Sequence, residues 1–246
     1  MPQTPPPEAR LAATMVLVRD DPFEVLLVRR HAKAVFASAL VFPGGVVDDD
    51  DYSAEWMPLL ASGADLPDQE RAIRIAGIRE TFEETALLLA TRPDGSPVDQ
   101  PDRTDTPFID IVRACEGRLR LDDVQHFGHW ITPEISPRRF DTHFLLAQAP
   151  PRQQAVADGG ETVELEWASP AEVIERARTD ARSIMFPTLL NLMRLAESTD
   201  TATALAAAQG RLPYTVLPVV ETRDDGTTVA VIPPEAGYGI TEHPAP

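Results

Sequence analysis

Three closely spaced glutamates, Glu80, Glu83 and Glu84, are the residues of this sequence best suited to chemistry. On a helix, at about 100° per residue, they fall together on the side opposite the apolar residues of the same stretch. Like charges at these spacings repel each other by about 0.2–0.5 kcal/mol per pair, and Arg79 is the cation placed to reach Glu83. A hard divalent cation such as Mg²⁺ or Mn²⁺ binds carboxylate oxygens and would relieve this repulsion.

The elements around these glutamates favour a metal site over a solvated acidic helix face. The spacing predicts a helix over Pro67–Ala90, with Pro67 suited to its start. A short strand and a Pro-Gly-Gly turn at Pro43-Gly44-Gly45 precede it. A turn of this kind brings backbone atoms close to whatever the helix binds.

The rest of the chain reads as strands mixed with helices. Four prolines in residues 1–10 indicate a flexible lead-in, and residues 11–246 are expected to form one domain. A hairpin over 12–19 and 23–30, strands at 129–132, 139–149 and 161–167, and helices at 108–121, 170–178, 185–197 and 201–209 are expected, with a second hairpin at 214–232. This pattern predicts an α/β fold, with a mixed β-sheet between helices.

Composition excludes several classes of function. The chain has 246 residues, with 22 basic and 39 acidic side chains and a net charge of −17. Such a field disfavours binding to nucleic acids and to anionic membranes. The one cysteine, Cys115, cannot form an intrachain disulfide. We find no membrane-spanning apolar run and no secretory signal, and we expect a cytoplasmic protein.

The helix resembles the motif of the Nudix hydrolase family, G-x5-E-x7-R-E-U-x-E-E-x-G-U, where U is a bulky aliphatic residue. The segment 79–87 matches its second half, and Phe42-Pro43-Gly44-Gly45 matches the usual lead-in. Thr81 replaces an aliphatic residue, and Ala86 replaces a glycine, which we expect a helix to tolerate. The resemblance implies an α/β/α sandwich.

One departure from the motif is large. The motif places 13 residues between its first glycine and its arginine, whereas 33 lie between Gly45 and Arg79, which is an insertion of 20 residues. We place it at about 48–66, with a C-terminal extension at about 183–240. The first glutamate of the motif then falls on Asp51 counting forward or on Arg71 counting back, with Glu70 one position away. The sequence leaves these alternatives open.

The insertion, the segment Pro137–Thr142 and the segment Glu161–Pro170 are similar to a branch of the family that contains a peroxisomal coenzyme A diphosphatase of animals. An upstream signature associated with coenzyme A is only partly present. Arg29 fits its first arginine, but Ala34 and Ser38 stand where a second arginine and a glycine are expected.

The resemblance implies roles for individual residues. The metal ligands would be Glu80, Glu83, Glu84 and the carbonyl of Gly44. Glu80 and Glu84, with Arg79 holding the glutamates in register, would form the catalytic group. Glu161, in a glycine-rich loop, is a candidate for a further catalytic carboxylate. Substrate contacts are expected from four basic residues: Arg29, Arg30, Lys33 and Arg139.

Other features carry plainer expectations. Asp48–Asp51 reads as a solvated acidic loop. Arg139 is expected to pair with Asp141 across one strand face, or to contact phosphate. His126 and His129 lie three residues apart without a third ligand nearby in the sequence, so a zinc site is not expected. The apolar residues of the insertion, Trp56 and Leu59 among them, are candidates for the wall of an apolar slot.

The resemblance implies an enzyme that hydrolyses a nucleoside diphosphate linked to another group. Coenzyme A or an acyl-coenzyme A is the first candidate substrate. ADP-ribose, NADH, a nucleotide sugar or a dinucleoside polyphosphate is the second. A module that binds a nucleotide without cleaving it is the alternative from another class, and a homodimer is a further expectation.

Overall fold

A mixed β-sheet forms the centre of the fold. The computed structural model describes residues 6–30, 40–160, 162–179, 184–212 and 214–244. The strands of the main sheet are β1 (Arg10–Arg19), β2 (Glu24–Arg30), β3 (Leu40–Val41), β4 (Gly44–Val46), β7 (Gln125–Ile131), β8 (Phe140–Gln148), β9 (Thr162–Ala168) and β10 (Thr215–Val216). Their order is β10-β7-β8-β1-β2-β3, with β4 paired to β1 and β9 paired to β2. The pairs β1–β8 and β7–β10 are parallel and the other pairs are antiparallel, so the expected mixed sheet is confirmed.

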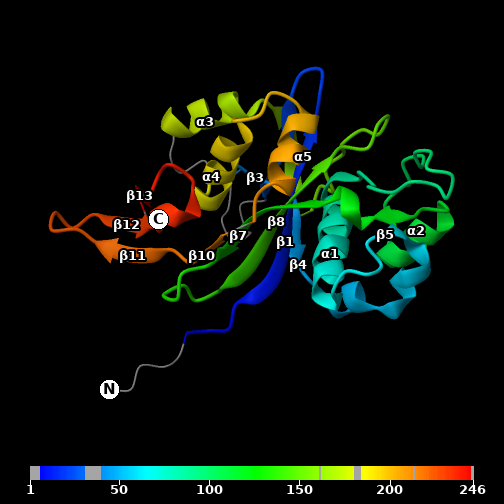
Figure 1. The fold of residues 1–246 in the computed structure, drawn as a ribbon, viewed down its shortest axis with the longest axis horizontal. Helices are drawn as coiled ribbons and strands as arrows, with labels where there is room; N and C mark the ends of the chain where they lie inside the picture. Colours follow the sequence, from blue (N-terminus) through cyan, green and yellow to red (C-terminus); the bar gives the residue numbers. More distant parts are fainter. Residues whose placement is uncertain (1–5, 31–39, 161, 180–183, 213, 245–246) are drawn as a thin grey trace.

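Helices cover both faces of this sheet (Figure 1). They are α1 (Asp68–Thr85), α2 (Phe108–Ala114), α3 (Pro170–Thr179), α4 (Phe186–Leu195) and α5 (Thr201–Gln209). The apolar residues of α1 and α2 share one buried cluster with one face of the sheet, and those of α3, α4 and α5 share a second cluster with the other face. The expected α/β/α sandwich is therefore confirmed.

The alternation of β1 explains the two clusters. Ala13, Met15 and Leu17 point toward α1, whereas Val16 and Val18 point to the opposite face, as the period of two of a strand requires. The expected hairpin is confirmed, although β1 begins at Arg10, inside the segment expected to be flexible.

Helix α1 lies very close to the sheet at Gly77. A Cβ atom at this position would lie 2.9 Å from Cδ1 of Leu145 and 3.2 Å from Cε of Met15. A side chain at this position would force the ends of Leu145 and Met15 to move, so glycine favours the close approach of α1 to β1 and β8. This contact contributes to the depth at which α1 packs.

The insertion and the tail add smaller elements. The insertion contains the 3₁₀ helices η1 (Asp49–Tyr52) and η2 (Ala54–Leu59) and the strand β5 (Leu60–Ser62), which pairs with β6 (Leu119–Arg120), followed by η3 (Leu121–Asp123). The tail forms a separate sheet of β11 (Val219–Thr222), β12 (Thr228–Val231) and β13 (Glu242–Pro244), with η4 (Pro234–Ala236) before β13.

Two helices are shorter than the sequence pattern predicts. Helix α1 ends at Thr85 instead of Ala90 because Ala86 adopts the left-handed conformation, with φ of 61°. Ala86 occupies the glycine position of the motif, so that position ends a helix and does not continue one. An alanine there costs about 1 kcal/mol. Helix α2 ends at Ala114 instead of residue 121, and Glu116, with φ of 54°, turns the chain away.

Among the described residues, no helix combines the length and the apolar character needed to cross a membrane.

Candidate active site

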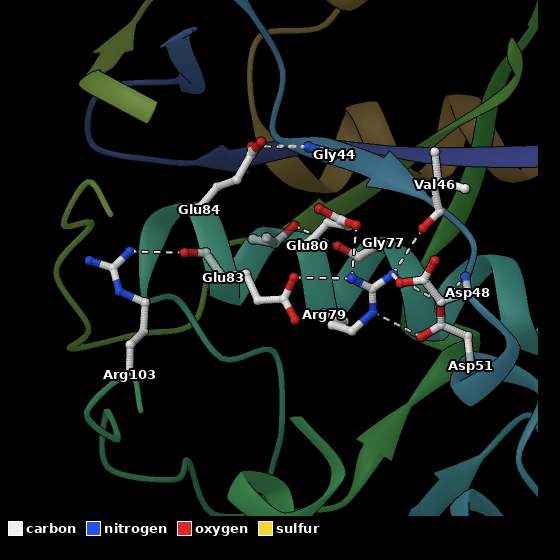
Figure 2. A network of polar contacts seen from close by, with 11 residues as sticks. Gly44, Val46, Asp48, Asp51, Gly77, Arg79, Glu80, Glu83, Glu84 and Arg103 are labelled. Carbon is white, nitrogen blue, oxygen red and sulfur yellow. Dashed lines mark hydrogen bonds and ion pairs between the residues drawn. The ribbon is translucent and has the colours of Figure 1, made fainter. Parts of the chain in front are cut away.

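Arg79 is the centre of the polar network on α1 (Figure 2). Its Nε and Nη2 atoms donate to the two carboxylate oxygens of Asp51, each at 3.0 Å. Nη2 also donates to the carbonyl of Val46 at 2.9 Å. The Arg79 side chain is 11% exposed and that of Asp51 is 1% exposed. This ion pair is therefore buried and bidentate, an arrangement that fixes both groups in orientation as well as in position.

The same guanidinium holds two of the three glutamates. Its Nη1 atom donates to Oε1 of Glu80 at 2.8 Å and to Oε2 of Glu83 at 3.0 Å. Burial raises the pKa of Glu80 to about 7, with Glu83 and Asp51 adding to the effect and Arg79 opposing it. Burial also raises the pKa of Glu83. Arg79 lies within 4.0 Å of four carboxylates, so the charges of these described residues do not balance. They are those of Asp48, Asp51, Glu80 and Glu83.

Glu84 joins the end of α1 to the Pro-Gly-Gly turn. Its Oε2 atom accepts a hydrogen bond from the backbone N–H of Gly44 at 3.1 Å, and the residue is 4% exposed. Gly44 in turn lies against β1, where an added Cβ would be 2.4 Å from the carbonyl oxygen of Ala13. The turn and the third glutamate are thus fixed relative to the sheet.

Gly45 provides the space that the Glu80 carboxylate occupies. A Cβ atom at Gly45 would lie 2.4 Å from the carboxylate carbon and from Oε1 of Glu80. No larger residue fits at Gly45 while Glu80 keeps this position. The two glycines of the turn therefore have separate roles, one toward β1 and one toward Glu80.

The contacts decide which acidic residue takes the place left open by the motif. Asp51 pairs with Arg79, whereas Glu70 contacts Arg74 and Arg71 contacts Asp68, both within α1. The spacing from Gly45 to Asp51 is therefore that of the motif, and the extra residues follow Asp51. The expectation of a solvated loop at Asp48–Asp51 is wrong for Asp51, which is buried because it neutralises a buried arginine.

Arg103 is a residue of this region that the sequence analysis did not find. It donates to the carbonyl of Glu83 at 3.1 Å (Figure 2). It also donates to the carbonyl of Ala157 at 2.6 Å. It thus connects the end of α1 to the loop before β9, and the N–H of Val156 bonds to the carbonyl of Thr85 nearby. A cavity of about 160 Å³ adjoins it, lined by Phe82, Glu83, Arg103, Thr104, Thr106, Phe108 and Ile111. No motif or periodicity marks Arg103, because its partners are backbone carbonyls distant in sequence.

Two arginines expected to contact substrate, Arg29 and Arg139, bond to other parts of the chain and not to the glutamates of α1. Arg29 donates to Glu164 on the neighbouring strand β9 at 2.9 Å. By alternation with Val25 and Leu27 it lies on the sheet face opposite α1. Arg139 donates to the carbonyls of Thr132 and Pro7, and this fixes the chain before β8. The expected pair between Arg139 and Asp141 is wrong, since Asp141 contacts His129 instead.

Some expected residues cannot be placed. Lys33 and Glu161 lie outside the described residues, as do Ala34 and Ser38 of the upstream signature. The backbone of Arg30 ends β2, and its side chain is outside the description. Their roles stay predictions.

The apolar residues of the insertion do not form an open slot. Trp56 and Leu59 are 3% and 6% exposed and belong to the core on the α1 side of the sheet. The ring of Trp56 packs against that of Phe108 with centroids 5.6 Å apart. Tyr52 and Met57 lie at the surface. The slot expectation is therefore wrong for Trp56 and Leu59, because these side chains attach the insertion to α2.

Comparison with known proteins agrees with this geometry. Residues 60–195 match the model of the NUDT19 Nudix domain, which is more than half of the chain. The chain belongs to the Nudix hydrolase family. The matched segment begins after Asp51, so the contact between Asp51 and Arg79 joins the matched domain to the residues before it.

Two curated relatives are the acyl-coenzyme A diphosphatases NUDT19 of Gallus gallus and Xenopus laevis. The first is 29% identical over 232 residues, covering 70% of this chain and 61% of that protein. The second is 25% identical over 226 residues, covering 70% and 60%. This Nudix chain thus spans about three fifths of the length of these relatives. A crystal structure of a NUDIX hydrolase from Alicyclobacillus acidocaldarius is 25% identical, with a TM-score of 0.66, covering 81% of this chain and 96% of that one.

The ion pair of Arg79 yields a prediction for stability. Asp51→Asn removes one charge of a buried pair, and we expect it to lower the free energy of unfolding by about 3 kcal/mol. Asp50→Asn, at the exposed neighbour, is the matched control and should change it by less than about 0.5 kcal/mol. Urea titrations of the three proteins measure both values. Equal unfolding midpoints for the two variants would contradict the assignment.

The contact between Gly45 and Glu80 yields a second prediction. Gly45→Ala should leave the free energy of unfolding within about 1 kcal/mol, because a side-chain end can move aside. It should nevertheless weaken Mn²⁺ binding about ten-fold or more, because Glu80 is displaced from the other carboxylates. Electron paramagnetic resonance of free Mn²⁺ measures the affinity. Native affinity in the alanine variant would show that Glu80 is not held by this contact.

Proposed function

We propose that this chain is a metal-dependent diphosphatase whose substrate is coenzyme A or an acyl-coenzyme A. The observation that carries the proposal is the arrangement of Glu80, Glu83 and Glu84 around the Arg79–Asp51 pair, beside the Gly44-Gly45 turn. The names of the two diphosphatase relatives support the substrate class.

The residues fit a hard divalent cation. The donors are carboxylate oxygens. Arg79 is the cation paired with four carboxylates among the described residues, Asp48 included, so the site lacks positive charge. Oxygen ligands suit Mg²⁺ and Mn²⁺ better than softer metals. Glu80, Glu83 and Glu84, with the carbonyl of Gly44, would hold the ion. Arg79 is a positioning residue, since its N–H donors bond to Asp51, Val46, Glu80 and Glu83.

When bound, the ion supplies positive charge to the diphosphate and lowers the pKa of the attacking water. The chain itself orients the carboxylates through Arg79 and fixes the turn through Glu84. Glu80 acts as a ligand or as the base that takes the proton of that water. The water oxygen would bond to one phosphorus, and the bond from that phosphorus to the bridging oxygen would break, so that the other phosphate leaves with the bridging oxygen. For coenzyme A this yields 3′,5′-ADP and 4′-phosphopantetheine.

Glu161 remains our candidate for a further catalytic carboxylate. What supports it is the loop before β9, where Val156 and Ala157 are bonded to the end of α1 and to Arg103. Among the expected substrate contacts, Arg30 and Lys33 keep the role of a cationic grip for the 3′-phosphate. Arg29 is a weaker candidate, because it pairs with Glu164 on the sheet face opposite α1. Arg139 is the weakest of them, because its guanidinium already binds two carbonyls.

The metal assignment predicts the effect of removing a ligand. Glu83→Gln and Glu84→Gln should each lower kcat by a factor on the order of 10²–10⁴, because the variants lose charge that stabilises the transition state through the ion. The control is Glu175→Gln on α3, an exposed glutamate of the same type. The melting temperature of each protein is measured alongside kcat. Mg²⁺ should raise the melting temperature of the parent protein and of Glu175→Gln, but not that of the two site variants. Unchanged Mg²⁺-dependent turnover in both site variants would reject the site.

The substrate assignment needs a separate assay. We expect coenzyme A or its acyl derivative to be cleaved with higher kcat/KM than ADP-ribose, NADH, a nucleotide sugar or a dinucleoside polyphosphate. Dephospho-coenzyme A should be at least about ten-fold poorer, because it lacks a charge-assisted contact. Product identification by mass spectrometry at equal substrate concentrations decides this. Cleavage of ADP-ribose or NADH but not of coenzyme A would support the hydrolase assignment and contradict the substrate assignment. Nucleotide binding without any cleavage would favour the non-catalytic module.

A further inference from the structure

A second set of potential metal ligands lies on strands β7 and β8. His129 stands directly opposite His143 in the antiparallel register of these strands, and Asp141 lies two residues before His143 on the same face. His143 alternates with Leu145, which packs against Gly77, so this face is the one that α1 covers. The partners that His129 lacks nearby in sequence are therefore supplied by the neighbouring strand.

The three side chains converge. Nε2 of His129 lies 2.5 Å from Oδ1 of Asp141, and Nε2 of His143 lies 4.0 Å from the same oxygen. The two imidazole rings are stacked with centroids 4.1 Å apart. One ligand atom from each residue can be chosen so that all lie within 4.8 Å of one another. Ligands at ~2.0–2.1 Å from a tetrahedral zinc ion are about 3.4 Å apart, which is within this range.

The surroundings of the cluster are those of a ligand set. Oγ1 of Thr215, on β10, lies 2.8 Å from Nδ1 of His129 and so leaves Nε2 directed at Asp141. Metal-bound histidines are typically oriented by such a contact to their second nitrogen. Nδ1 of His143 is buried and has no hydrogen-bond partner among the described residues. Buried polar atoms are normally satisfied, and an ion bound by Nδ1 of His143 would satisfy this one.

We propose that His129, Asp141 and His143 bind one zinc-type transition-metal ion, at a site separate from the glutamates of α1. Two imidazoles and one carboxylate suit Zn²⁺ and Co²⁺, whereas the all-oxygen donors of α1 suit Mg²⁺ and Mn²⁺. The side chains are 19%, 30% and 11% exposed, so an ion and a water ligand can enter from solvent. The bound ion would join β7 to β8 and, through Thr215, to β10.

The test is equilibrium dialysis of the full chain against ZnCl₂ with an excess of MgCl₂. The Glu83→Gln/Glu84→Gln double variant serves as background, because it removes zinc bound at the α1 glutamates. We expect this background to retain one equivalent of Zn²⁺. His129→Gln or His143→Gln in the same background should weaken that binding at least ten-fold. His243→Gln is the control, since His243 contacts Phe186 and Pro244 and is not one of the three proposed ligands.

Two further measurements keep the outcome clear. Co²⁺ bound to the background protein should show the visible absorption band of a four-coordinate site. Asp141→Asn, which preserves side-chain shape, should abolish this band. Circular dichroism without metal shows whether each variant folds. Absence of a bound Zn²⁺ equivalent in the double variant would overturn the proposal. So would Zn²⁺ binding that Asp141→Asn and the folded histidine variants leave unchanged.

Discussion

The buried pair of Arg79 and Asp51 is the constraint on which the arrangement of the site depends. A guanidinium cannot lose its proton at physiological pH, so its burial requires anionic partners. Asp51 supplies two of the contacts, and the remaining donors reach Glu80, Glu83 and the carbonyl of Val46. One planar group thereby sets the directions of an aspartate from η1 and of two glutamates from α1. The acidic cluster remains compact because this cation lies inside it.

Close backbone approach is the second requirement of the site. Gly77 lets α1 lie against β1 and β8, Gly44 lets the turn lie against β1, and Gly45 makes room for Glu80. These glycines belong to two elements, α1 and β4, and each of them lies in the same small region between helix and sheet. The same three glycines therefore allow both the close packing of α1 on the sheet and the observed positions of the carboxylates.

The sequence predicted the parts of this site that depend on local spacing. The glutamates of α1, the turn at Gly44 and the mixed α/β fold all follow from periodicity and from the resemblance of a short segment. The role of Asp51 could not be fixed, because 20 inserted residues make counting from either end give a different answer. The end of α1 at Ala86 was missed because alanine does not signal a left-handed residue. The cluster of His129, Asp141 and His143 depends on strand register, which a single sequence does not reveal.

The position of the insertion has a consequence for how this fold can vary. The inserted residues begin after Asp51 and end at the start of α1, and the ring of Trp56 packs them against Phe108 of α2. The two ends that it connects are already held together by the Arg79–Asp51 pair. The length of this segment can therefore change without moving either end. A sequence-motif search that requires a constant separation between the glycine and the arginine overlooks proteins of this architecture. A structural search for the ion pair finds them.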